Sequence, residues 1–471
     1  MGLIFLKTNN NALANRISAP NTYYLLDSIR PDILLLQILC KNLILWDSIL
    51  PTNQWIQSQI PTVISEAIAS NQANIVITQS HISIIAGSCF AIGLKFAGSL
   101  LKKPYLLLLE YLDYLVNLKK FINDDATSNI LESCLTTIAC SLSFIMAGSG
   151  DLKLLQIFRK LRQRVHNDLT YGNYMATHMA IGMLFLSGGK YSLSTDNMAI
   201  ASLLISFYPQ FPSFTSDNRY HLQALRHLYV LALEKRCIET LDIDTNESCM
   251  VQLDVLLKES SLFKETTIKL VSPCILPEFK HIKSIKISSP RYLEQTIEIS
   301  NESSHSLFLK HQTIYIKRKA AFMSYSQDAK GDKSILSRSI PKYSLAFNST
   351  FKERKQKNNN DFIQAFSADP NIMSFMNYFC NDIGNGTALP ATFSQFSTSV
   401  LYECLTHDKL EALTAYFVLY TLTLNQKKRQ NLLQNFELLL KFYSEYWKEQ
   451  TLMISIPFQE SVRVYCGYKN M

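Results

Sequence analysis

The hydrophobic pattern in the first half of the chain repeats. Three segments share a frame in which Ala is followed by Gly or Ser two positions later, then by Leu or Met, and then by Phe: AIGLKF at 91–96, ACSLSF at 139–144 and AIGMLF at 180–185. Small residues follow each segment (AGS at 97–99, AGSG at 147–150, SGGK at 187–190), and then a second apolar run. The pattern predicts a unit of about forty residues, made of a helix, a glycine-containing turn and a second helix.

One such hairpin cannot bury both of its apolar faces, whereas stacked neighbours can. We therefore expect an α-solenoid over residues 1–236. Small residues in the frame allow helices to approach closely, and glycine supplies the left-handed turn. On this basis Gly182→Leu is expected to force adjacent helices apart. The repeat positions are Ala91, Gly93, Phe96, Ala139, Ser141, Phe144, Ala180, Gly182, Phe185 and Gly188.

The stretch DNRYHLQALRHLYVLALE, 217–234, combines helical spacing of apolar residues with many ionisable groups. We predict one helix, capped by Asp217 and buried on nearly all sides. His221 and His227 are six residues apart, about 240° around a helix, so they do not form a metal-binding pair. We interpret the histidines and arginines as hydrogen-bond partners of neighbouring loops rather than as catalytic groups.

Alternating apolar and polar residues replace the helical period after Arg236. Short runs separated by Pro, Ser and Asn predict antiparallel strands, and hence a small β-sandwich over 237–325. The runs are VQLDVLL (251–257), TTIKLV (266–271), IKSIKIS (282–288), LEQTIEI (293–299) and QTIYIK (312–317). Asp242 and Asp244 are expected at a strand edge or turn.

The last third divides into two parts. Residues 326–361 are polar and lysine-rich, which indicates a surface loop or a disordered linker. Its cluster KERKQK (352–357), like KRK at 317–319, is either a nuclear-import patch or part of a solvated loop. A helical C-terminal domain is predicted over 362–471, beginning where Asp369 caps a helix with Pro370 at its first position. The aromatic run FYSEYW (442–447) is either core or partner-facing.

Composition narrows the class of protein. Apolar residues make up 47%, charged residues 18%, and the mean hydropathy is +0.03, which argues against a polytopic membrane protein. Two apolar segments, 81–94 and 178–189, are shorter than the ~20 residues that a membrane-spanning helix needs. The net charge of +8 lies in short runs rather than in a stripe for nucleic acid. The ten cysteines include no Cys-x-x-Cys pair and the N-terminus has no secretion signal, so we expect the nucleus and cytoplasm.

Motifs for catalysis do not stand out. The segment SGGKY lacks the first glycine and the hydroxyl of a phosphate-binding loop, the histidines have no partner at zinc spacing, and there is no Gly-x-Ser-x-Gly. We expect no catalytic residue, cofactor, metal or small-molecule substrate. A cryptic enzyme would require His221 and His227 to take part in an activity.

The tract 171–232, with GGKYSLST followed by DNRYHLQALRHLYVLA, resembles the family of the large scaffold subunit, subunit 1, of the anaphase-promoting complex. Further similar stretches are APNTYYLLDSIRPDILLL (19–36), LILWDSILP (43–51), SPRYLEQTIEIS (289–300) and QAFSADPNIMSFMNYFC (364–380). The repeats of that family, called proteasome/cyclosome repeats, also occur in the two large non-ATPase subunits of the proteasome regulatory particle. Family members are several times longer and begin with a β-propeller, so we expect this chain to correspond to a C-terminal portion.

The resemblance implies a non-catalytic scaffold in a cullin–RING ubiquitin ligase that controls mitotic progression. It implies cullin-like, Doc-domain and tetratricopeptide subunits as partners. A scaffold of the proteasome base is the alternative, which the β-sandwich disfavours.

Overall fold

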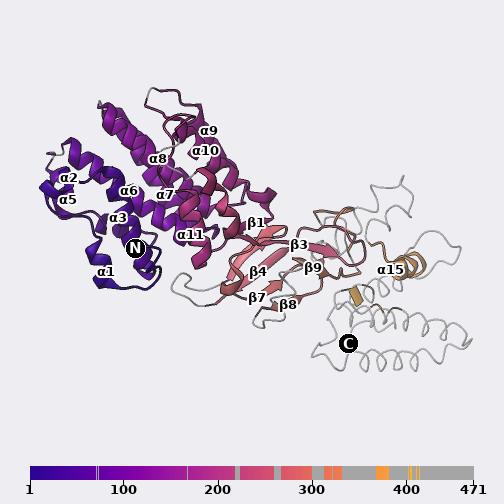
Figure 1. Cartoon of the computed structure of the whole chain (residues 1–471). Helices are drawn as coiled ribbons and strands as arrows, with labels where there is room; N and C mark the ends of the chain where they lie inside the picture. The colour runs from indigo at the N-terminus through magenta and orange to yellow at the C-terminus, as the bar shows by residue number, and fades with distance from the viewer. Residues whose placement is uncertain are drawn as a thin grey trace, which may run out of the picture.

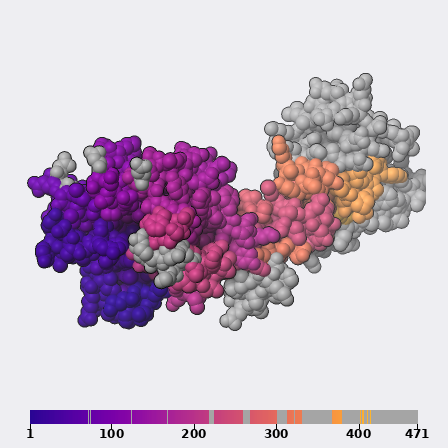
Figure 2. All heavy atoms as spheres, turned by 45° about the horizontal axis from the view of Figure 1, so that its top comes forward, coloured from indigo at the N-terminus to yellow at the C-terminus, as the bar shows by residue number. Residues whose placement is uncertain are grey.

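The computed structural model describes residues 1–217 except 71, 73, 123 and 167, residues 223–258, residues 267–299, residues 312–330 except 321, residues 367–380, and the single positions 401, 404, 405, 410 and 413. A helical part comes first, two β-sheets follow, and a short helix lies beyond them (Figure 1). In the space-filling view the helical part, indigo to magenta, meets the strand-rich part, pink to orange, along one side (Figure 2).

Four helices form a row in which each packs against the next: α3 (Pro31–Ile44), α6 (Ile75–Lys95), α8 (Asp125–Ile145) and α10 (Tyr171–Leu184). Helix α7 (Lys102–Leu118) packs on α8, and α9 (Leu152–Gln163) packs on α10. The row helices α6 and α8 are buried along most of their length, whereas α7 and α9 bury one stripe, as their amphipathic sequences require. The remaining α-helices of the part are α1 (Asn11–Arg16), α2 (Tyr23–Ser28), α4 (Asn53–Ser58), α5 (Thr62–Ala69) and α11 (Asn197–Ser206).

Side-chain caps fix where these helices begin. Asn74, Asp124, Asp151 and Thr170 each accept a hydrogen bond from the backbone N–H three residues later, at the starts of α6, α8, α9 and α10. The glycine-containing breaks fix where three of them end, because the residues after Phe96, Met146 and Phe185 leave the helical conformation. The helices expected from the repeated hydrophobic pattern are therefore confirmed.

Helices α6 and α8 are long and apolar enough to cross a membrane, so the length limit inferred from 81–94 is wrong, because α6 extends to 21 residues. In both helices the most apolar window is largely buried inside the protein, 78% for α6 and 83% for α8. Their apolar character is accounted for by their place in the middle of the row.

The prediction of one buried α-helix over 217–234 is wrong. Residues Gln223–Ala232 form a 3₁₀ segment, η4, and Leu233–Lys235 form strand β2, which pairs with β1 (Tyr191–Leu193). Val230 and Leu231 are more than half exposed. Strand pairing with β1 overrides the local helical pattern, because residues 233–235 satisfy their backbone groups by antiparallel pairing with the distant strand β1 instead of along a helix.

Two sheets enclose one core. One has the order β5–β4–β7–β8 and is antiparallel, the other the order β6–β3–β9. The five predicted runs correspond to β4 (Gln252–Leu257), β5 (Thr267–Val271), β7 (Ile282–Ile287), β8 (Gln295–Glu298) and β9 (Thr313–Ile316). Strands β3 (Cys237–Asp242) and β6 (Cys274–Ile275) were not predicted, and β3 pairs with β9 in parallel, so the all-antiparallel expectation is wrong for that pair. Inward side chains from both sheets, such as Val255, Ile285 and Ile314, form a shared core, as in a β-sandwich.

Beyond the sheets, Asp369 accepts hydrogen bonds from the N–H groups of Asn371 and Ile372 at the start of α15 (Pro370–Phe375), which confirms the predicted cap. Of the loop or linker predicted over 326–361, residues 331–361 lie outside the described residues, as do most of the predicted C-terminal helical domain and the run 442–447.

Candidate functional site

The glycine-containing breaks form one repeated turn at the same end of successive row helices. The N–H groups of Gly98 and Leu100 donate to the carbonyls of Phe144 and Ile145, at 2.8 and 3.1 Å. In the next turn, Gly148 and Gly150 donate to the carbonyls of Met183 and Leu184, at 3.1 and 3.0 Å. All four donors have positive φ, between +56° and +78°. Each turn thus satisfies carbonyls at the end of the next helix, where regular helical partners run out.

A further copy of this turn lies at residues 5–9. Lys7 and Asn9 have positive φ, and their N–H groups donate to the carbonyls of Leu43 and Ile44, the last two residues of α3, at 3.0 and 2.9 Å. This copy was not predicted from the sequence, although GLIF at 2–5 matches GLKF at 93–96. The hydrogen bonds also correct the frame of the second copy: the residues that end the helices are Phe96, Met146 and Phe185, so Ala139, Ser141 and Phe144 lie two residues ahead of equivalent positions.

The repeat positions differ in what surrounds them. A Cβ atom on Gly93 would lie 2.8 Å from the Ser141 Cα, so α6 and α8 are in backbone contact there. The Phe144 ring lies 5.7 Å from Phe90 and 4.8 Å from Phe207, centroid to centroid. Ala91, Ala139, Ala180 and Phe96 are buried, whereas Phe185 is 44% exposed.

Gly182 has no neighbour within 4 Å of a Cβ atom, and the same holds for Gly188. The expectation that Gly182→Leu would force adjacent helices apart is therefore wrong. The described residues place nothing on the face of α10 that corresponds to the face where Gly93 meets Ser141.

Buried cations hold backbone carbonyls at several loops. Lys95 donates to the carbonyls of Trp46, Asp47 and Ile49 at 2.8–3.2 Å, and burial lowers its pKa to about 8. Arg226 donates to the carbonyls of Ser206, Tyr208 and Gln210 at 2.9–3.0 Å, and burial lowers its pKa to about 10. For Arg226 this confirms the prediction that arginines of the 217–234 stretch form hydrogen bonds with neighbouring loops. His227 is exposed, and His221 lies outside the described residues. Asp217 accepts from the N–H of Ser213 at 3.0 Å.

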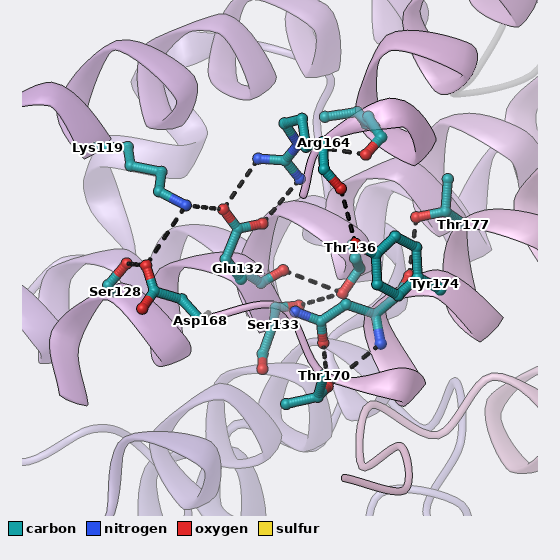
Figure 3. A network of polar contacts seen from close by, with 12 residues as sticks. Lys119, Ser128, Glu132, Ser133, Thr136, Arg164, Asp168, Thr170, Tyr174 and Thr177 are labelled. Carbon is teal, nitrogen blue, oxygen red and sulfur yellow. Dashed lines mark hydrogen bonds and ion pairs between the residues drawn. The ribbon is translucent and has the colours of Figure 1, made fainter. Parts of the chain in front are cut away.

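A second polar cluster surrounds Glu132 at the opposite end of the helices (Figure 3). The Glu132 carboxylate is fully buried and receives two hydrogen bonds from Arg164, at 2.9 and 2.7 Å, and one from Lys119. Asp168 accepts from the Ser128 hydroxyl at 2.7 Å and lies 3.8 Å from Lys119. The cluster ties the ends of α7 and α9 to α8. The local sequence pattern did not predict this cluster, because Glu132 occupies an ordinary position in an amphipathic run.

A third cluster joins the helical part to the sheets. The fully buried Arg236 donates to the carbonyl of Gly98 at 2.8 Å, and its Nε lies 2.9 Å from Glu234 Oε2. Glu278 accepts from the hydroxyl of Thr195 and lies 2.7 Å from the Lys280 ammonium. Burial alone would raise the pKa of Glu278, but hydrogen bonds from His281 and Lys280 and the charges of Lys280 and Arg236 hold it well below its usual range.

The same junction reaches the first turn. The Lys7 ammonium donates to the carbonyl of Thr195 at 2.7 Å. The Tyr191 carbonyl lies 2.4 Å from where a Cβ atom of Gly148 would be, so β1 lies directly on the turn. The sheets are thus joined to the ends of the row helices.

These clusters hold the fold together and offer little for chemistry. Within the described residues no group of three or more His, Cys, Asp or Glu side chains is placed to hold a metal ion. Burial raises the pKa of Cys134 and of Cys140 to about 12, which keeps both thiols protonated and unreactive. Asp242 accepts from the N–H of Asp244 in a turn, as expected.

By fold and polar clusters, the chain has a mainly helical part joined to a β-sandwich, and its buried charges pair with its own backbone carbonyls and its own side chains. Comparison with known families narrows this further. The model described as APC1 fifth domain matches residues 1–234, the APC1 beta sandwich domain matches 236–319, and the anaphase-promoting complex subunit 1 C-terminal domain matches 361–460.

Curated relatives agree. The chain is 36% identical to anaphase-promoting complex subunit 1 of Dictyostelium discoideum, over 95% of this chain and 23% of that protein. It is 40% identical to the Homo sapiens subunit 1, over 89% of this chain and 22% of that protein. A relative named negative regulator of mitosis, from Emericella nidulans, is 38% identical over 68% of the chain. The chain belongs to the anaphase-promoting complex subunit 1 family, and it spans less than a quarter of the length of these relatives.

Proposed function

We propose that this chain is a non-catalytic scaffold in the anaphase-promoting complex, a multi-subunit cullin–RING ubiquitin ligase that controls mitotic progression. The observation that carries the proposal is the match of three domains of one subunit family, in order along the chain. The helical part is then an α-solenoid of proteasome/cyclosome repeats. The interlocked turns support this, because each unit uses the N–H groups of its turn to hold the next unit.

The mechanism follows from rigidity. A scaffold raises the effective concentration of the catalytic and substrate-receptor subunits by holding them at fixed distances. Such a frame must have little internal motion. The three polar clusters restrict motion at both ends of the helices and at the junction with the sheets. Bond-making belongs to other subunits, so the chain itself is not an enzyme.

Partners and location follow from the same proposal. The partners are cullin-like, Doc-domain and tetratricopeptide subunits, and the protein is present in nucleus and cytoplasm. Fluorescence imaging of a tagged chain that found it confined to another compartment would contradict the proposed location.

Affinity purification of the tagged chain from its own cells, followed by mass spectrometry, tests the proposal. We expect a cullin-like subunit and at least one tetratricopeptide subunit to be enriched over a tag-only control. Enrichment of proteasome regulatory-particle subunits instead would favour the related scaffold of the proteasome base. Recovery of neither set would contradict a scaffold role in either assembly.

A further inference from the structure

The outward face of α9 carries positive charge and no negative charge. The helix reads LKLLQIFRKLRQ, with basic residues at four positions and no Asp or Glu. It buries Leu154, Phe158 and Leu161, which are spaced three and four residues apart, against the helical part. The opposite side is exposed and consists of Lys153, Gln156, Arg159, Lys160 and Gln163, which we call the α9 basic face.

The charges of this face are not used inside the molecule. Among the described residues, the side chains of Lys153, Arg159 and Lys160 take part in no ion pair. Two acidic residues that flank α9 in the sequence are engaged elsewhere, since Asp151 caps α9 itself and Asp168 contacts Ser128 and Lys119.

Helix α7, which like α9 packs against the row of helices and buries one stripe, carries charges of both signs. Helix α7 begins with Lys102 and Lys103 but also carries Glu110 and Asp113. A single-sign face is therefore a property of α9 and not of outer helices in this chain.

The face has a regular spacing. Lys153 and Lys160 are seven residues apart, as are Gln156 and Gln163, so each pair is separated by roughly 10 Å along the helix axis. Two apolar side chains flank it, Leu152 with 69% exposure at the start and Val165 with 84% exposure just beyond the end. Helix α9 lies at the top of the helical part in the view of Figure 1, and the side chains of the α9 basic face are exposed.

We propose that the α9 basic face binds an acidic polypeptide segment of a partner protein. Carboxylates of the segment pair with Lys153, Arg159 and Lys160, the two glutamines hydrogen-bond its backbone, and apolar residues at its ends contact Leu152 and Val165. Charge complementarity of this kind speeds encounter and selects partners. The surface is additional to the scaffold role, so it stands whether or not the purified chain recovers ligase subunits.

A protein segment fits better than a nucleic acid. The face covers one helix of twelve residues, roughly 18 Å long. Nucleic-acid sites follow a longer phosphate track and commonly add aromatic side chains on which bases stack. The only aromatic residue of α9, Phe158, is fully buried.

Fluorescence anisotropy with the full chain tests the proposal. The probe is a labelled 14-residue peptide with alternating Glu and Gly in its centre and Leu at both ends, and the matched probe has Gln in place of every Glu. We expect the Glu peptide to bind at least tenfold tighter, with an affinity that falls as NaCl rises from 50 to 300 mM. Equal binding of the two peptides, or no binding of either, would overturn the proposal.

Two double variants locate the binding. Arg159→Gln with Lys160→Gln removes two charges of the α9 basic face and is expected to weaken binding of the Glu peptide roughly 3- to 10-fold, since exposed ion pairs contribute modestly. Lys258→Gln with Lys283→Gln removes the same charge from exposed positions on the sheet and serves as the control. Circular dichroism verifies that both are folded. A control that weakens binding as much, or a dT14 oligonucleotide that displaces the peptide at lower concentration than unlabelled peptide, contradicts the assignment.

Discussion

Glycines in the same frame of this chain serve different purposes, and single substitutions separate them. A side chain at Gly93 has no room because the Ser141 backbone is in contact with it, whereas Gly182 faces open space. Gly93→Val is therefore expected to lower the free energy of unfolding by at least ~1–3 kcal/mol through overpacking. Gly182→Ala is expected to raise it by up to about 1 kcal/mol, because alanine favours the helix. Urea denaturation measures both, and equal destabilisation by the two would contradict this difference in packing.

His81 gives the helical part a sensitivity to acid. Burial lowers the pKa of His81 to about 4, from an ordinary value of 6.5, and its ring lies edge-on to Tyr114 at 6.3 Å. Between pH 6.5 and 4 the unfolded chain binds the proton and the folded chain does not, so stability falls as the pH is lowered through this window. The difference corresponds to roughly 3 kcal/mol.

Denaturation of the His81→Phe variant at pH 7 and pH 4.5 tests the assignment. The loss of stability between these two values is expected to be smaller than in the unmodified chain by an amount approaching that figure. His227→Phe, which replaces a histidine at an exposed position, is the matched control and is measured at the same two pH values. An unchanged loss in His81→Phe would show that other groups cause it.

At the scale of elements, the sequence pattern predicted those helices and strands that are determined by residues close together in the chain. Helical spacing with Asn, Asp or Thr caps identified the row helices, and alternation identified five strands. The pattern failed where distant partners decide. Strand β2 forms because β1, some forty residues earlier, pairs with it, and η4 precedes it in place of the predicted α-helix. The frame of the second repeat was shifted because SLSF imitates the end of the helix two residues too early.

Most contacts within the polar clusters could not be predicted from the sequence, because they also join residues that are distant in the chain. Glu132 lies in α8, Arg164 follows the end of α9 and Lys119 follows the end of α7, and nothing in their spacing says that they meet. The left-handed turns were predictable, because glycine marks two of them. The sequence did not predict which of those glycines also contacts another element.

The repeated turn gives a sharp test at this scale. Gly148 and Gly188 both have positive φ, +78° and +62°, which Asn tolerates better than other residues. A Cβ atom at position 148 would clash with the Tyr191 carbonyl, whereas position 188 is open. Gly148→Asn is therefore expected to separate β1 from the turn and lower the free energy of unfolding by more than ~2 kcal/mol, and Gly188→Asn by less than ~1 kcal/mol.

Hydrogen–deuterium exchange resolves where the change occurs. In the Gly148→Asn variant, the peptides that cover 148–150 and 191–193 are expected to exchange faster, because the N–H groups of residues 148 and 150 lose their acceptors at Met183 and Leu184 and β1 loses its support. Protection that remained unchanged in this region would mean that the turn does not hold the next helix.

For the whole molecule, the central question is whether helical part and sheets act as one body. Arg236 and Glu278 connect them, and both lie on the strand-rich side while their partners, Gly98 and Thr195, lie on the helical side. A scaffold gains its effect from fixed geometry, so this junction is where loss of rigidity would matter most. The lowered pKa of Glu278 makes the stability of the fold depend on pH. The stabilising contribution of Glu278 is present above the ordinary pKa near 4.5 and is lost as the pH falls through the lowered value.

Glu278→Ala tests the junction at neutral pH. It leaves Lys280 and the Thr195 hydroxyl without their carboxylate. Because Lys280 is partly exposed, the expected loss is at the lower end of the roughly 3–5 kcal/mol typical for breaking a buried ion pair. Calorimetry is expected to change from one unfolding transition to two, as the helical part and the sheets lose their coupling. Glu294→Ala removes an exposed pair with Lys286 and is expected to cost less than ~1 kcal/mol with one transition retained. A single transition in Glu278→Ala, shifted no more than in Glu294→Ala, would show that the two parts are held together by their apolar contacts alone.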